Sequence, residues 1–373
     1  MSSPRSAFLD LARAAAILMM LQGHTLDAVL AVEARAGTAF DLWTFLRGLT
    51  ACMFLLLSGL AFTLATDRHW TGHVTSRSTI TRRLRRFGFF LLLGYALHFP
   101  MAKFRHLPGM GDERWRSFLA VDVLQCTAVM LIVLQVLVWV VRTRGRHAGV
   151  VMLGCVAIVA LTPAMWGIDW AARLPLAIAA YLSPATGSLF PLFPWGSYVL
   201  FGAALGHLQV QRDIDPAAGV GDRVWLLGGV GLLALALISI SIPIAPFGAA
   251  HFWSTSPTQF LLRTGLVLVV LSAVSLISQY VSKPPYAVQA LAQESLTIYA
   301  VHLCLVYGSV WNVGLRQLVG PSLTILPALG AVAVMWVSMA ALACAWRWCK
   351  QHQPGAAQWI RAGTGGLLLG RLL

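Results

Sequence analysis

The first apolar segment of the chain, residues 7–32, carries the ionisable side chains Asp10, Arg13, His24 and Asp27. At about 100° of rotation per helical residue, all four fall on one face about 100° wide. Arg13 and His24 would then lie roughly 16 Å apart along the helix axis. Ionisable groups are unfavourable inside a bilayer and usually mark a functional site or a paired charge. The spacing therefore predicts a polar stripe that reaches past the middle of the membrane.

The residue types in this stripe favour proton chemistry. The unperturbed pKa of histidine is about 6.5, so a neutral imidazole at His24 is able to accept a proton near neutral pH. Asp27, about one helical turn away, is placed to orient the ring or to cap the end of the helix. The structural alternative is a buried Asp10–Arg13 ion pair with one hydrogen-bonded core histidine. Keeping a whole aligned stripe in lipid for packing alone is unfavourable, which argues against that alternative.

A second polar stripe lies late in the chain, in the apolar segment 290–311. On a helix, Ser295, Tyr299 and His302 fall within about 60° of one another, and Glu294 lies at the end of the same segment. His302 is therefore a second candidate catalytic residue. The alternative is that Ser295 and Tyr299 only connect neighbouring helices and that His302 satisfies a nearby polar group.

Between the second and third apolar segments, residues 67–86 are expected to form a basic loop. A run of this kind usually fixes membrane topology or contacts anionic lipid. Arginine also suits phosphate, because its planar fork binds phosphate through two hydrogen bonds. A phosphate-bearing ligand that arrives from the cytoplasm is the alternative interpretation of this stretch. It holds six arginines and two histidines: Arg68, Arg77, Arg82, Arg83, Arg85, Arg86, His69 and His73.

Composition assigns the chain to the membrane. Hydrophobic residues make up 58% of the 373, only 11% are charged, and the mean hydropathy is +0.75. A soluble domain of this length needs a polar shell and has no means to cover so much apolar surface. The net charge of +14 arises in short loops beside the apolar runs. This follows the positive-inside rule and indicates membrane orientation, with no nucleic-acid partner.

The apolar runs predict an all-α, polytopic membrane protein with a bundle of about ten transmembrane helices, each long enough to cross ~30 Å of hydrocarbon. With both termini in the cytoplasm, the inner segments hold more than twice as many arginines and lysines as the outer ones, so N-in/C-in is expected. Residues 1–349 form the transmembrane domain, and 350–373 form a cytoplasmic tail that lies at the interface or frays. The spans are expected near residues 7–32, 44–66, 84–102, 118–141, 148–170, 192–210, 224–242, 259–281, 290–311 and 323–346.

Several other classes lose support. The chain has no GxxxxGK[ST], HExxH, GxSxG or GxGxxG motif, which argues against nucleotide hydrolysis, zinc proteolysis and a serine hydrolase. Its six cysteines lie in or beside apolar spans without a CxxC pair, so neither a disulfide framework nor a metal site is expected. Gly202 and Gly206 form a GxxxG pattern, which favours close helix packing within the bundle over a homodimer face.

Five segments together resemble a known family. FLDLARAAAILMMLQGH (8–24) resembles the D-x-x-R-G…H first helix of the acyltransferase-3 superfamily, and in particular of the bacterial relatives of heparan-α-glucosaminide N-acetyltransferase. MFLLLSGLAFTLATDR (53–68) is similar to the Ser-Gly second helix of that group, and VLQCTAV (123–129) to its Leu-Gln segment. FPLFPWGSYVLFGAALG (190–206) and ESLTIYAVHL (294–303) are similar to its Phe-Pro-Trp-Gly helix and its late Tyr-x-x-His helix.

This resemblance implies an acyltransferase that moves an acyl group, usually acetyl, from acyl-CoA to an amine or hydroxyl of a sugar or cell-envelope glycan. It places the chain in the cytoplasmic (inner) membrane of a bacterium. The catalytic candidates are His24 as general base, Asp27 and His302. The candidates for binding the acyl-CoA are Arg13, Ser58, Arg82, Arg83, Arg86 and Trp195.

Two further interpretations stay open. In a secondary transporter or flippase for an anionic or glycan substrate, the histidines would relay protons, although no internal repeat supports this class. In a non-catalytic scaffold, the polar stripe would have no purpose. Direct transfer in a ternary complex and transfer through an acyl-His24 intermediate both fit the residues.

Overall fold

The computed structural model of the chain describes residues 7–100, 109–212, 221–241, 253–281 and 283–372, and this described part is helical, with isolated bridges in place of strands. The chain divides into two compact units, which are treated separately. Unit 1 comprises residues 1–50, 96–118 and 282–373, and unit 2 comprises residues 51–95 and 119–281. The long helix α2, Thr38–Asp67, contributes its first part to unit 1 and its remainder to unit 2.

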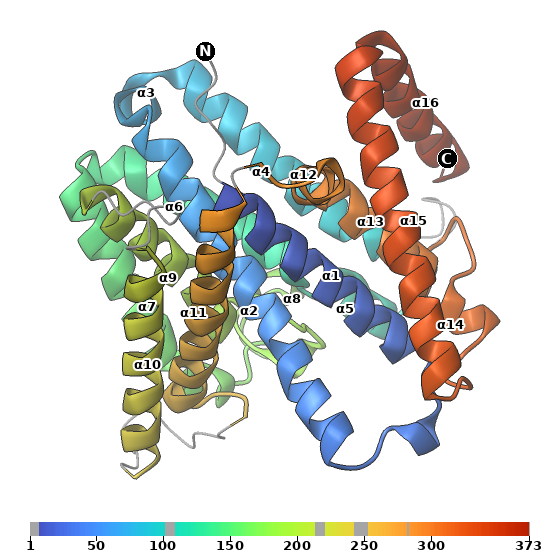
Figure 1. The fold of residues 1–373 in the computed structure, drawn as a ribbon, viewed down its shortest axis with the longest axis horizontal. Coiled ribbons are helices and arrows are strands. Elements are labelled where there is room, and N and C mark those ends of the chain that lie inside the picture. Colours follow the sequence, from blue (N-terminus) through green and yellow to red (C-terminus); the bar gives the residue numbers. More distant parts are fainter. Residues whose placement is uncertain (1–6, 101–108, 213–220, 242–252, 282, 373) are drawn as a thin grey trace. The chain divides into compact units, whose positions relative to one another are not determined.

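Unit 1 is built around α1, which packs against α12, α13 and α15 (Figure 1). Its buried core includes Ile17 and Leu21 of α1, Ile298 of α13 and Met335 of α15. After α1, Ala31 N–H donates to the Leu323 carbonyl (2.8 Å) and ties the end of α1 to the start of α15. Besides the start of α2, its helices are α1 Ala7–Val29, α5 Asp112–Leu119, α12 Tyr286–Gln293, α13 Ser295–Tyr307, α14 Leu315–Leu318, α15 Ile325–His352 and α16 Pro354–Leu372, with a 3₁₀ turn at Val32–Ala34.

Unit 2 contains the close helix pairs α7–α9 and α10–α11, with α6 against α7 and α9. A Cβ added to Gly202 would lie 2.0 Å from the Leu56 carbonyl oxygen, so α9 contacts α2 backbone to backbone. This confirms that the GxxxG pattern serves packing within the bundle. Besides the end of α2, its helices are α3 Trp70–Thr75, α4 Arg77–Leu97, α6 Val123–Val141, α7 Arg144–Trp166, α8 Leu176–Ala179, α9 Leu192–Gln211, α10 Gly221–Ile240 and α11 Pro257–Tyr280, with a 3₁₀ turn at Pro184–Thr186.

Among the described helices, six are long and apolar enough to cross a membrane: α2, α6, α7, α10, α11 and α15. A seventh is added if the bent pair α12–α13 counts as one span. The chain is therefore a multi-pass integral membrane protein with an all-helical fold. The spans expected near residues 7–32, 84–102 and 192–210 correspond to the helices α1, α4 and α9. By length and composition, these three helices are not among those that could cross a membrane.

Two expectations are corrected by the structure. The segment 290–311 is not one helix, because α12 and α13 meet at Glu294 with a bend of 79°. The Glu294 carboxylate pairs there with Lys350 of α15 (2.5 Å), which holds the break. The basic stretch 67–86 is not a loop either. Arginine favours helix, Ser76 caps the next helix by accepting from Thr79 N–H (3.4 Å), and α4 therefore begins within the arginine run.

Candidate functional site

The polar stripe of α1 meets the stripe of α13 at two histidines. His24 Nδ1 lies 3.0 Å from His302 Nε2, within hydrogen-bonding distance, although 278 positions separate them in the chain. His302 is fully buried, whereas His24 is only partly buried. The structure thus brings two of the predicted catalytic residues into direct contact in unit 1.

A backbone carbonyl determines which nitrogens of this pair carry protons. His302 Nδ1 lies 2.8 Å from the Ile298 carbonyl, which only accepts hydrogen bonds, so Nδ1 carries the proton. In neutral His302 the Nε2 atom is then an acceptor, and His24 Nδ1 must donate to it. Neutral His24 therefore carries its lone pair on Nε2. This is the protonation state that a general base requires.

Tyr307 connects this histidine pair to Asp27. Its ring lies edge-on to His24, with 5.6 Å between ring centroids, and its hydroxyl donates to Asp27 Oδ2 (3.3 Å). Asp27 Oδ1 accepts from Arg47 of α2 (3.0 Å), and the Arg35 guanidinium lies 4.0 Å from the same oxygen. Asp27 thus anchors Arg47 and Tyr307, and the Tyr307 ring contacts His24. Tyr307 and Arg35 were not predicted as site residues, because both lie outside α1, the helix that carries Asp27.

The other two residues of the first stripe, Asp10 and Arg13, lie on α1 before His24. Asp10 is buried and Arg13 is half-buried, and Arg13 lies about three turns before His24 on the same continuous helix. Tyr299, from the second stripe, lies edge-on to His302 with 5.7 Å between ring centroids. Both predicted stripes are therefore continuous with the histidine pair.

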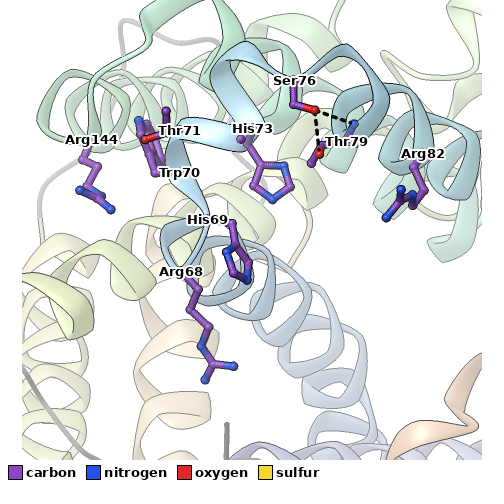
Figure 2. A pocket seen from close by; sticks show the side chains of 10 residues that line it. Arg68, His69, Trp70, Thr71, His73, Ser76, Thr79, Arg82 and Arg144 are labelled. Carbon is purple, nitrogen blue, oxygen red and sulfur yellow. Dashed lines mark hydrogen bonds between the residues drawn. The ribbon is translucent and has the colours of Figure 1, made fainter. Parts of the chain in front are cut away.

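Unit 2 contains a basic cavity of about 670 Å³ at the junction of α2, α3 and α4. Figure 2 shows Arg68, Arg82 and Arg144 on three sides of His69 and His73. The lining has no acidic side chain, although Arg144 pairs with the neighbouring Asp67 carboxylate (2.5 Å). Arg68 and Arg82 add further positive charge, so the cavity favours an anionic ligand with several acceptor oxygens. It is lined by Arg68, His69, Trp70, Thr71, Gly72, His73, Ser76, Thr79, Arg82 and Arg144.

Arg83 lies behind the cavity wall. Its Nη1 donates to Thr66 Oγ1 (2.6 Å), to Gln135 Oε1 (3.2 Å) and to His73 Nδ1 (3.3 Å). Since His73 accepts at Nδ1, its neutral ring carries the proton on Nε2. Burial, and to a smaller extent the positive charge of Arg83, lower the pKa of His73 to about 4, so the ring is neutral at neutral pH. His73 is therefore a neutral hydrogen-bond donor in the cavity wall.

Most of the other residues predicted to bind acyl-CoA do not line the cavity. Ser58 donates to the Phe54 carbonyl of its own helix (2.8 Å), and the Arg86 guanidinium carbon lies 5.7 Å from the centroid of the Phe90 ring. The Trp195 ring lies 4.7 Å from that of Phe190 and 5.9 Å from the Arg263 guanidinium. Arg82 alone among the predicted set lines the cavity, while Arg144, a lining residue from the start of α7, was missed. Arg144 lies more than 60 positions after the other lining residues, so nothing in the sequence indicated that it joins them.

Unit 2 also contains a second histidine pair. His147 Nδ1 lies 2.7 Å from His207 Nε2, and both side chains are almost fully buried. The Trp70 ring, which lines the cavity, lies edge-on to both, at 5.6 Å from His147 and 6.0 Å from His207. Within the described residues, no three His, Cys, Asp or Glu side chains gather as metal ligands.

These features describe a multi-pass membrane protein with a hydrogen-bonded histidine pair in unit 1 and an arginine-lined cavity in unit 2. The family model of the heparan-alpha-glucosaminide N-acetyltransferase catalytic domain matches residues 5–237, more than half of the chain. The chain therefore belongs to this family of transmembrane N-acetyltransferases, which confirms the resemblance found in its sequence. A search of curated proteins gave no match. The family match includes His24 and the cavity residues but ends before His302, whose role rests on its contact with His24.

Proposed function

We propose that the chain transfers an acetyl group from cytoplasmic acetyl-CoA to an amine or hydroxyl of a sugar or cell-envelope glycan, with His24 as general base. The observation that carries this proposal is the hydrogen-bonded series from the Ile298 carbonyl through His302 to His24 Nδ1, which places the lone pair of His24 on Nε2. Membership of the acetyltransferase family supplies the reaction class.

The proposed reaction balances without a metal or a redox partner. The acceptor nitrogen or oxygen attacks the carbonyl carbon of the acetyl thioester, and His24 Nε2 takes the proton that the acceptor loses. The C–S bond then breaks, CoA leaves as its thiolate, and the proton on His24 passes to that sulfur. The imidazolium formed in between keeps its Nδ1–H bond to His302, so the pair holds the ring in one orientation throughout.

The cavity of unit 2 is proposed to bind the phosphates of CoA. Arg68, Arg82 and Arg144 supply planar donors, and His73 adds a neutral N–H donor whose proton position Arg83 determines. In the proposed N-in/C-in topology this cavity faces the cytoplasm, where acyl-CoA is present. The arginines at its rim and the positive-inside rule both favour that side.

The experiment is an assay of the purified protein in detergent with radiolabelled acetyl-CoA and acceptors that end in glucosamine. We expect acceptor-dependent release of CoA thiol and equal incorporation of label into the acceptor. His24→Gln should abolish both while the variant still binds acetyl-CoA. Binding of acetyl-CoA by wild-type protein without any transfer across a panel of amino and hydroxyl acceptors would overturn the proposal, because transport of a substrate needs no such transfer.

A further inference from the structure

A buried arginine in unit 1 has no counter-charge among the residues that the structure describes. Arg347, near the end of α15, is 9% exposed, and its Nη2 donates to Gln289 Oε1 of α12 (2.9 Å). Its Nε and Nη1 are buried and have no hydrogen-bond partner in the described part of the chain. A guanidinium stays charged at all physiological pH values, and a buried charge without an acceptor is strongly unfavourable. Arg347 therefore needs an acceptor that these protein contacts do not supply.

The acidic side chain of this region is already engaged. Glu294, at the α12–α13 break, pairs with Lys350 (2.5 Å), one turn after Arg347 on α15. Arg361 of α16, which turns back beside α15 in Figure 1, places its guanidinium carbon 5.5 Å from the Trp346 ring. The side-chain amide nitrogen of Gln293 is a further buried donor without a partner. Lys350 also lies 6.0 Å from the Trp346 ring, so Arg361 and Lys350 meet at the residue next to Arg347. With Gln293 next to Glu294, this end of α15 has more donors than acceptors and more positive than negative charge.

The depth of this end of α15 in the membrane indicates what could supply the acceptor. The apolar run from Ile325 to Ala345 has about the length that crosses the ~30 Å hydrocarbon core. Trp346 and Trp348 follow it directly, as aromatic residues do at the level of the headgroups. The Tyr286 ring lies 4.7 Å from the Arg347 guanidinium carbon at the same end of the helix. Arg347 therefore lies at the depth where lipid phosphates are found.

We propose that Arg347, with Lys350 and Arg361, binds a phosphate group at the membrane surface. The phosphodiester of a phospholipid is ionised at neutral pH and has only acceptor oxygens, which matches a site whose unsatisfied atoms, Arg347 Nε and Nη1 and Gln293 Nε2, are all donors. Basic pockets between membrane helices bind anionic lipid headgroups in this way. Because Arg347 also holds Gln289 of α12, and Lys350 holds the break before α13, the bound phosphate would stabilise the helix that carries His302. This inference does not depend on the proposed acetyl transfer, and its test uses no activity.

The experiment compares wild-type protein, Arg347→Gln and the matched control Arg212→Gln, which changes an exposed arginine at the end of α9. Each is purified in neutral detergent, and native mass spectrometry counts bound phosphatidylglycerol and phosphatidylcholine after mixed micelles of the two lipids are added. We expect the wild type and Arg212→Gln to retain phosphatidylglycerol about tenfold more than phosphatidylcholine. Arg347→Gln should lose that preference.

A thermal-unfolding series identifies the source of the phosphate. In neutral detergent alone, Arg347→Gln should unfold at the same temperature as the wild type or higher, since it removes an unpaired buried charge. Phosphatidylglycerol should raise the unfolding temperature of the wild type and leave Arg347→Gln unchanged. An equal rise with inorganic phosphate, again absent in Arg347→Gln, would assign the site to a soluble phosphate. If wild-type protein shows no lipid preference and no rise with phosphatidylglycerol or inorganic phosphate, the proposal is wrong, and this holds even if the variant fails to fold.

Discussion

The chain contains two hydrogen-bonded histidine pairs, one in each unit, and their surroundings differ. In unit 1, His24 is only partly buried, and Tyr307, Asp27 and Arg47 form a polar group beside it. In unit 2, His147 and His207 are both almost fully buried, and Trp70 covers them. A short N···N distance alone therefore does not identify a base, because a base must also reach the atom whose proton it takes.

Unit 2 differs from unit 1 in a second respect. Its accessible polar groups line the arginine cavity, together with Trp70. There Arg83 holds His73 in a neutral form that donates a hydrogen bond. Unit 1 thus has the groups for proton transfer, whereas unit 2 has the groups for holding an anion. If this division is correct, substitutions in unit 1 should lower turnover, and substitutions in unit 2 should weaken donor binding or stability.

The largest expected effect separates the two histidine pairs. His24→Ala should lower acetyl transfer by 10²–10⁴-fold, the usual contribution of a general base, while expression and acetyl-CoA binding are kept. His207→Ala should keep the turnover number and lower the unfolding temperature by a few degrees, because it leaves the buried Nδ1 of His147 without a partner. Turnover is measured by CoA release and stability by thermal unfolding in detergent. A His24→Ala variant with more than about a tenth of wild-type turnover would contradict the comparison.

The next effect concerns the partner of the base. His302→Gln keeps an acceptor oxygen for His24 Nδ1–H, whereas His302→Leu removes it, so the leucine variant should lose about tenfold more kcat. The pH dependence of kcat separates a positioning role from a purely structural one. The leucine variant should shift the acidic limb of that profile, on which activity falls as His24 is protonated, because nothing then holds the His24 tautomer. Equal kcat values and equal pH profiles in the two variants would remove His302 from the proposed mechanism.

For the cavity of unit 2, we expect a substitution to weaken the binding of acetyl-CoA without slowing the transfer step. Arg82→Gln should raise the KM for acetyl-CoA about tenfold and leave kcat unchanged, since a charge-assisted hydrogen bond contributes about 1.5–3 kcal/mol. Arg85→Gln is the matched control, an exposed arginine of the same helix that does not line the cavity. A fall in kcat with an unchanged KM in the Arg82 variant would show that the division between the units is wrong.

The smallest expected effect is a pH dependence of stability in the cavity wall. The pKa of His73 is lowered to about 4 in the folded protein and is about 6.5 when unfolded, so between these values the unfolded chain binds more protons. The stability due to neutral His73 is therefore present above pH 6.5 and is lost as the pH falls toward 4. His73→Gln should show a smaller drop in unfolding temperature between pH 7 and pH 4.5 than the exposed control His69→Gln. Equal drops would indicate that His73 is not held neutral.

Much of the candidate site in unit 1 could be predicted from the sequence because it depends on local periodicity. The α1 stripe needs only the helical repeat and the cost of ionisable groups in lipid, and α1 is one continuous helix from Ala7 to Val29. The same reasoning placed His302 and Tyr299 on one face of a helix, which α13 provides. Composition also sufficed for the membrane class, since no soluble fold covers so much apolar surface.

What the sequence could not supply were the pairings between distant segments. The contact between His24 and His302, the attachment of Asp27 to Arg47 and Tyr307, and the entry of Arg144 into the cavity wall all depend on how separate helices pack. The α12–α13 break likewise depends on Lys350, which lies 56 positions after Glu294. Even the proton positions follow from such contacts, because a carbonyl one turn before His302 determines which nitrogen of His24 carries the lone pair. Residue types and spacing determined which groups were available for chemistry, and only the packing of the helices decided which of them meet, because hydrogen bonds act over about 3 Å and no local pattern encodes a distance between segments.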